Sequence, residues 1–260
     1  MDQLLAKLTN LGYEFFGVVL PGIVTVLFLV CGWGALGPLP SFCSFGVFPD
    51  LSAQNAARFF ERLSVQSEVS VAVSGFAIVY FVGHIVLWIS RASRPDDGGK
   101  TSAPRRIWTS LVFKIPRPKD SYDSNLEELF QAVNAKFSIN GTTMTWRQFY
   151  PVVKSFLSKN LTYSLVATYQ NKYTLHRSIT AAAALLFWLT VVGAMVGIVT
   201  GHFAGVAPRW GLLITLACLA LVLVWGFSDS YAYHWKMFGN TIITEAYSVI
   251  YGPNDAQQSK

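Results

Sequence analysis

Four apolar stretches constrain this chain more than any other feature of its sequence. Each is close to the ~20 residues that a helix needs to cross a bilayer core about 30 Å thick. Their limits are Tyr13–Trp33, Val69–Ile89, Ser178–Thr200 and Trp210–Phe227. None carries Asp, Glu, Lys or Arg at its centre, where each would cost about 2.5–3.5 kcal/mol on insertion. We therefore predict an all-α integral membrane protein with four transmembrane helices, rather than a soluble protein with buried helices.

Positive charge is concentrated between the second and third apolar stretches. Residues 90–177 hold fourteen Lys and Arg against six Asp and Glu, whereas the whole chain has a net charge of +6. Residues 34–68 hold only two Arg, and the connection 201–207 holds neither Lys nor Arg. Because loops rich in Lys and Arg stay on the cytoplasmic side, we expect both termini and the basic segment inside. Residues 34–68 and 201–209 are then outside.

The apolar stretches divide the chain into four parts. These are 1–89 (an N-terminal interfacial helix, two transmembrane helices and an outer loop), 90–177 (a small, basic, helical cytosolic insert), 178–228 (the third and fourth transmembrane helices) and 229–260 (a C-terminal cytosolic helix and tail). Within the first transmembrane helix, Pro21-Gly22 should bend the helix or leave a backbone carbonyl without its donor.

Two amphipathic helices are predicted inside the basic insert. The first follows a capping signature, Ser124-x-x-Glu127, and the second begins near Thr145. Their apolar positions recur at helical spacing, and are Leu126, Leu129, Phe130, Val133 and Phe137, then Trp146, Phe149, Tyr150, Val153 and Leu157. The resulting hairpin has too small a core for high stability alone. We expect it to pack on the membrane-proximal helices or on neighbouring subunits.

A single long helix is predicted from Leu161 into the third apolar stretch, because neither Gly nor Pro occurs between Leu161 and Gly193. A rigid helix that is shared by a cytosolic module and a membrane span can carry a conformational change between them. Gly193 and Gly197 stand four residues apart, which favours close helix packing within or between subunits.

Nothing in the sequence indicates an enzyme. A Walker loop, GxSxG and HExxH are absent, the four His are far apart, and no acidic pair lies inside an apolar stretch. We therefore predict no catalytic residue, no cofactor and no metal site.

The second apolar stretch has one mildly polar face. Its members follow helical spacing and are Ser70, Ser74, Ala77, Phe81 and His84. This face could line an aqueous path on the axis of an oligomer, with Phe81 as a hydrophobic constriction and His84 near the inner mouth. The alternative is that the serines hydrogen-bond their own helix and His84 contacts a neighbour.

The basic insert has three interpretations. It could orient the chain and contact anionic lipids, dock an acidic partner protein, or bind a nucleotide or short oligonucleotide. Cations interleaved with aromatic residues favour stacking combined with phosphate contact. The candidate ligand-binding residues are Arg105, Arg106, Tyr169, Lys172, Tyr173, His176 and Arg177.

Several short motifs resemble the channel-like membrane effector of Hailong-type bacterial anti-phage defence systems. They are Tyr13-Glu-Phe-Phe-Gly-Val-Val-Leu-Pro-Gly22, Trp146-Arg-Gln-Phe-Tyr150, Tyr169-Gln-Asn-Lys-Tyr173 and Leu175-His-Arg177. The resemblance implies an oligomeric ion channel, preferably a tetramer, in the bacterial inner membrane. It also implies control by a partner nucleotidyltransferase that makes short DNA oligomers, and abortive infection through depolarisation.

The expected function is therefore that of a homo-oligomeric inner-membrane channel or depolarising effector, gated through its basic insert by a nucleotide or oligonucleotide. The alternative is a non-conducting membrane anchor that recruits an acidic cytosolic partner. A transporter is disfavoured, because neither an inverted repeat nor a charged residue within a span is visible.

Overall fold

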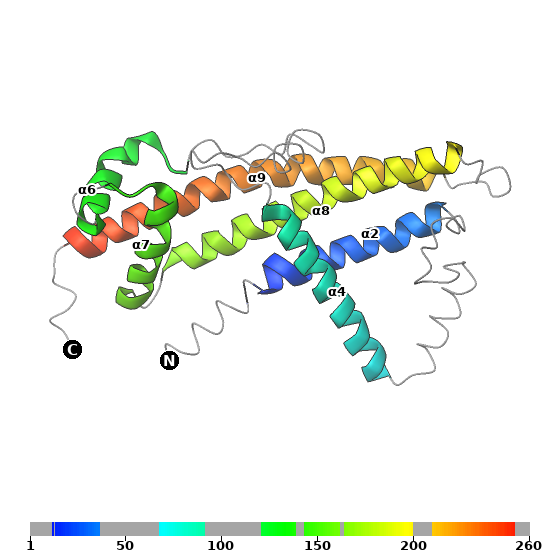
Figure 1. The fold of residues 1–260 in the computed structure, drawn as a ribbon, viewed down its shortest axis with the longest axis horizontal. Helices are drawn as coiled ribbons and strands as arrows, with labels where there is room; N and C mark the ends of the chain where they lie inside the picture. The colour runs from blue at the N-terminus through cyan, green and yellow to red at the C-terminus, as the bar shows by residue number, and fades with distance from the viewer. Residues whose placement is uncertain are drawn as a thin grey trace.

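The computed structural model describes residue 12 and residues 14–36, 68–91, 121–138, 143–161, 164–199 and 210–252, which are almost entirely helical (Figure 1). In chain order the elements are η1 Phe15–Val19 (a π-helix), α2 Leu20–Leu36, α4 Glu68–Ser90, η5 Ser124–Leu126 (a 3-10 turn), α6 Glu127–Phe137, α7 Trp146–Asn160, α8 Leu165–Val199 and α9 Trp210–Tyr251. The predictions for the N-terminal interfacial helix, most of the outer loop, Arg105, Arg106 and the C-terminal tail concern residues outside these ranges.

Four helical segments are long and apolar enough to cross a membrane, which confirms the prediction of an all-helical membrane protein. They are Phe15–Gly32, Ala72–Ser90, Leu165–Val199 and Trp210–Tyr251. Only 17–28% of their most apolar windows is buried within the chain. The remaining apolar surface is too large for a water-exposed protein, and needs lipid or other subunits to cover it.

The first span begins with an irregular turn before Pro21. Because proline has no N–H, the carbonyl one turn before it loses its usual helical donor. The backbone widens there into η1, where the N–H of Leu20 donates to the carbonyl of Phe15. The hydroxyl of Thr25 donates to the Pro21 carbonyl at 2.7 Å, which satisfies a polar group inside the span.

The first span and α4 cross where two glycines leave no room for a side chain. A Cβ on Gly22 would lie 2.1 Å from the Val79 carbonyl oxygen, and a Cβ on Gly83 would lie 2.1 Å from the Val18 carbonyl oxygen. Only glycine permits so close an approach of two backbones. Away from this crossing, the N-terminal part of α4 diverges from the other helices (Figure 1).

The antiparallel helices α8 and α9 form the long axis of the structure (Figure 1). They have 35 and 42 residues, which correspond to about 52 Å and 63 Å at ~1.5 Å per residue. A bilayer core is only about 30 Å thick, so both helices extend well beyond one membrane boundary. The long helix predicted from Leu161 is present from Leu165.

The predicted hairpin of α6 and α7 packs on these extensions, at the end where α8 begins and α9 ends (Figure 1). We call α6, α7, residues 165–177 and residues 229–251 the helical module. Its core is continuous across all four helices and consists of Phe130, Val133, Trp146, Phe149, Val153, Leu157, Val166, Tyr173, Tyr231, Trp235, Phe238, Ile242, Ile243 and Ala246. The hairpin therefore completes its small core by packing on α8 and α9 of its own chain.

Two local expectations differ from the structure. Ser124 was expected to cap a helix, but it lies in the 3-10 turn η5, and α6 begins only at Glu127. The helix expected from Asp229 is present but is not a separate element, because α9 continues through this residue from the fourth span. No proline interrupts α9 between Trp210 and Tyr251, so nothing stops the helix at the membrane boundary.

Candidate functional site

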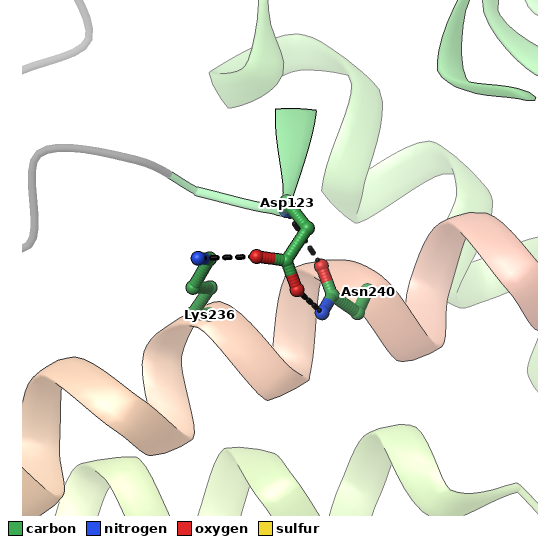
Figure 2. Close-up of polar contacts among 3 residues, drawn as sticks. All are labelled: Asp123, Lys236 and Asn240. Carbon is green, nitrogen blue, oxygen red and sulfur yellow. Dashed lines mark hydrogen bonds and ion pairs between the residues drawn. The ribbon is translucent and has the colours of Figure 1, made fainter. Parts of the chain in front are cut away.

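Asp123 fastens the start of the hairpin to α9 (Figure 2). Its carboxylate pairs with the ammonium of Lys236 and accepts a hydrogen bond from Asn240 Nδ2 at 2.6 Å, while its N–H donates to Asn240 Oδ1 at 2.8 Å. The hydrogen bonds from Lys236 and from Asn240 hold the pKa of Asp123 below its usual range. Because the ion pair is partly exposed, it adds little stability and mainly fixes position.

The backbone before the hairpin approaches α9 closely at Gly239, one residue before Asn240. A Cβ at Gly239 would lie 1.7 Å from the carbonyl oxygen of Ser121 and 3.3 Å from the Cβ of Tyr122. The backbone that leads into the hairpin therefore rests directly on the backbone of α9. This contact fixes the height at which the hairpin docks.

Hydrogen bonds inside the hairpin hold its connection in place. The buried side chain of Asn134 donates to the Met144 carbonyl at 2.9 Å and accepts from the Met144 N–H at 3.0 Å. The hydroxyl of Tyr122 donates to the Glu127 carboxylate at 2.8 Å. Burial, with the hydrogen bond to Glu127, raises the pKa of Tyr122. The hairpin is thus a defined unit and can dock as one body.

A second link joins α9 to the first residues of α8. The carboxylate of Glu245 accepts hydrogen bonds from the Ser164 hydroxyl at 2.6 Å and the Leu165 N–H at 2.9 Å. A carboxylate at this position satisfies a free N–H and favours the positive end of the helix dipole. The start of α8 is therefore held by α9.

A stacked histidine pair marks the place where α8 and α9 leave the module. The rings of His176 and His234 are 4.7 Å apart and nearly parallel, at 15°. A ring nitrogen of His234 is 2.7 Å from the Ser230 carbonyl oxygen, and Phe227 packs on His176 at 5.2 Å. This contact lies two residues before the predicted third span, so it joins the two helices at the boundary between module and membrane.

The predicted ligand-binding residues that the structure describes do not lie on one open surface. Tyr173 is 8% exposed and packs against Trp235 and Phe238, and Arg177 is 2% exposed. Lys172 is exposed, with its ammonium 5.5 Å from the ring centre of the half-buried Tyr169. Of the described candidates, Lys172 and Tyr169 are thus the accessible pair of a cation and an aromatic residue, while Tyr173 and Arg177 have structural positions.

The predicted polar face of α4 is exposed in the single chain. Its members Ser70, Ser74, Ala77, Phe81 and His84 are all open to the surroundings of the chain. Apolar neighbours such as Val73 and Ile78 are exposed too. Away from the crossing at Val79 and Gly83, this part of α4 is therefore available to lipid or to other subunits.

Sequence reasoning missed an ionisable cluster beside this face. The Tyr80 hydroxyl donates to the Glu14 carboxylate at 3.2 Å, and His84 Nε2 lies 4.0 Å from the same oxygen. The rings of Tyr80 and His84 meet edge to face at 4.5 Å. One signal could have pointed to it, since Glu14 is the acidic residue at the N-terminal end of the first apolar stretch.

The two predicted packing glycines lie in the C-terminal half of α8. Gly197 is buried and Gly193 is partly buried. Burial of Gly197 is consistent with a close helix contact. Gly22 and Gly83 make close backbone contacts between the first two spans.

Comparisons with models of protein families, with curated proteins and with solved structures gave no match.

Proposed function

We propose that this chain is the subunit of a homo-oligomeric ion channel in a bacterial inner membrane, with both termini and the helical module in the cytoplasm. A nucleotide or short DNA oligomer, supplied by a partner nucleotidyltransferase, acts on the module and changes the conductance. The supporting observation is that α8 and α9 each belong to the core of the module and to a membrane span.

The unbroken helices give the module a mechanical connection to the spans. Tyr173 of α8 and Phe238 of α9 pack in the module core, while Ala181–Ala184 of α8 are buried further along the same helix. Close-packed helices shift as rigid bodies between discrete arrangements. A shift of the hairpin against Gly239 and Asn240 would therefore move the parts of α8 and α9 that lie in the membrane.

Exposed aromatic residues support a bilayer around the apolar parts of the four spans. Trp88, near the C-terminal end of α4, is 71% exposed, and Trp225, four residues before the module part of α9, is 74% exposed. Trp210 is exposed at the N-terminal end of α9. Trp and Tyr collect at the two surfaces of a bilayer. The basic segment adjoins the module in the sequence, which favours placing the module end of the helices on the cytoplasmic side.

An ion path is best supported along α4. This helix carries the exposed series from Ser70 to His84, and its N-terminal part diverges from the rest of the chain (Figure 1). A four-span chain offers too few helices to enclose a path alone, so copies of α4 around an oligomer axis would line it. Phe81 would form the apolar constriction of such a path.

The signal would reach the module through its accessible cation and aromatic residue, Lys172 and Tyr169. An ammonium and a partly exposed aromatic ring suit a phosphate and a stacked base. Both residues lie one to two turns before His176, where α8 meets α9 at the membrane boundary. A ligand bound to Lys172 and Tyr169 would therefore act close to the contact between α8 and α9 at His176.

Ion flux from proteoliposomes tests the proposal. Purified full-length protein is reconstituted, and flux is measured alone and with added nucleotides or short DNA oligomers. Flux that an added compound switches on or off supports a regulated channel. Absence of flux under every condition, together with stable capture of an acidic cytosolic protein, would replace the channel by a membrane anchor.

A further inference from the structure

We infer that Glu14 is the charge-selectivity residue of the proposed channel and binds a permeant monovalent cation at its inner mouth. This inference rests on the proposed function and adds the sign of the ion and the residue that selects it.

The position of Glu14 is set by the crossing of the first span and α4. Glu14 lies one turn before Val18, whose carbonyl touches Gly83, and His84 directly follows Gly83. The carboxylate thereby reaches Tyr80 and His84 on consecutive turns of α4. These turns also carry Phe81, so the carboxylate lies beside the proposed constriction.

Tyr80 and His84 orient the carboxylate but leave it partly open. The hydroxyl of Tyr80 donates to one oxygen, Oε2, which is also the oxygen that faces His84 Nε2 at 4.0 Å. The side chains of Glu14 and His84 are each 45% exposed. A half-open carboxylate facing hydrocarbon is unfavourable. Water and a mobile cation on an oligomer axis would supply the missing solvation.

The surrounding charge favours a cation. Residues 14–36 and 68–90 contain neither Lys nor Arg, and the first cation after α4 is Arg91, about two turns beyond His84. The nearby cations of α8 are directed to aromatic rings, with Lys172 over Tyr169 at 5.5 Å and Arg177 over Tyr173 at 5.8 Å. Repeated around an oligomer, Glu14 would form a ring of carboxylates, which is the arrangement that selects cations in channels.

The test is the reversal potential of reconstituted protein in a planar bilayer under a KCl gradient. Wild-type current should reverse near the potassium equilibrium potential. Glu14→Gln should move the reversal potential toward zero or toward the chloride value, while Glu14→Asp, which keeps the charge, should retain most of the selectivity. Glu128→Gln is the matched control, because it removes the same charge from an exposed position on α6, and should leave the reversal potential unchanged.

The outcomes distinguish failure of the proposed role of Glu14 from failure of the proposed channel function. Wild-type current that reverses near the chloride potential would overturn the role of Glu14, even if the Glu14→Gln variant fails to assemble. The proposed channel function would still stand. Unchanged selectivity in a folded Glu14→Gln oligomer would lead to the same conclusion. A wild-type protein without current would reject the channel itself.

Discussion

Gly83 and Val18 are in backbone contact, since a Cβ on Gly83 would lie 2.1 Å from the Val18 carbonyl oxygen. Together with the matching contact at Gly22, it sets how α4 leaves the helix bundle. It also brings the side chain of His84 next to Glu14. The geometry of the proposed ion path thus depends on the absence of a side chain at two positions.

Replacing Gly83 by Ala should therefore force the two helices apart. We expect a loss of about 1–3 kcal/mol, as for other overpacked contacts, measured by unfolding in detergent. Gly75→Ala is the control, because a Cβ there meets nothing within 4 Å. It should be neutral, or gain up to about 1 kcal/mol from helix propensity. Equal stability of the two variants would contradict the close crossing.

Gly239→Ala should loosen the docked hairpin, because the new methyl group would collide with the Ser121 carbonyl. We expect faster proteolysis between residues 121 and 161, with α8 and α9 still helical by circular dichroism. The matched control on the same helix is Gly226→Ala, where a Cβ meets nothing within 4 Å. Cleavage at the wild-type rate in Gly239→Ala would argue against this docking contact.

Length and periodicity predicted much of this fold. Four spans, the hairpin and the long helix α8 follow from apolar runs and from helical spacing of residues such as Phe149 and Val153. Sequence spacing could not supply contacts such as Asp123 with Asn240, which are 117 residues apart. It also treated α9 as ending at the membrane, although nothing in the sequence breaks the helix there.

The candidate site was less predictable than the fold. Arg177 looks like an exposed membrane-proximal cation in the sequence, yet it is 2% exposed, because its face of α8 turns inward. Glu14 was not among the predicted site residues, and its contact with Tyr80 appears only once the helices cross. Which side of a helix faces a partner depends on packing rather than on local composition.

The Asp123 contact predicts a dependence of stability on pH. Its pKa is lowered from the ordinary value of 3.8 by Lys236 and Asn240. A lowered folded-state pKa contributes stability that is fully present above the unfolded-state pKa and is lost as the pH falls through the folded-state value. Wild type should exceed Asp123→Asn in thermal stability at neutral pH, and the difference should shrink at a pH below 3.8. A difference that does not change with pH would contradict the pairing.

The histidine pair should respond unequally to substitution by Phe. Among the described residues, the buried His176 Nδ1 has no hydrogen-bond partner, so His176→Phe should leave stability unchanged or raise it. His234→Phe removes the contact with the Ser230 carbonyl and should cost about 0.5–1.5 kcal/mol. Thermal unfolding of both variants in detergent measures the difference, and the reverse order would refute this assignment.

Charge reversal should separate a surface role from a structural one. Lys172→Glu changes an exposed side chain and should reduce the response of flux to added nucleotides or DNA oligomers while the protein stays folded. Arg177→Glu reverses a charge at a buried position and should reduce the yield of folded protein. A normal response in folded Lys172→Glu would remove Lys172 from the proposed ligand surface.

The most direct test of control by the module is ion flux from liposomes that hold equal amounts of wild type, Gly239→Ala or Gly226→Ala. Gly239 lies in the module, far along α9 from the span, so only transmission through the helices can connect it to an ion path. We predict altered flux for Gly239→Ala and wild-type flux for Gly226→Ala. Equal flux from all three proteins, with the hairpin shown by proteolysis to be loosened in Gly239→Ala, would contradict control of the membrane helices by the module.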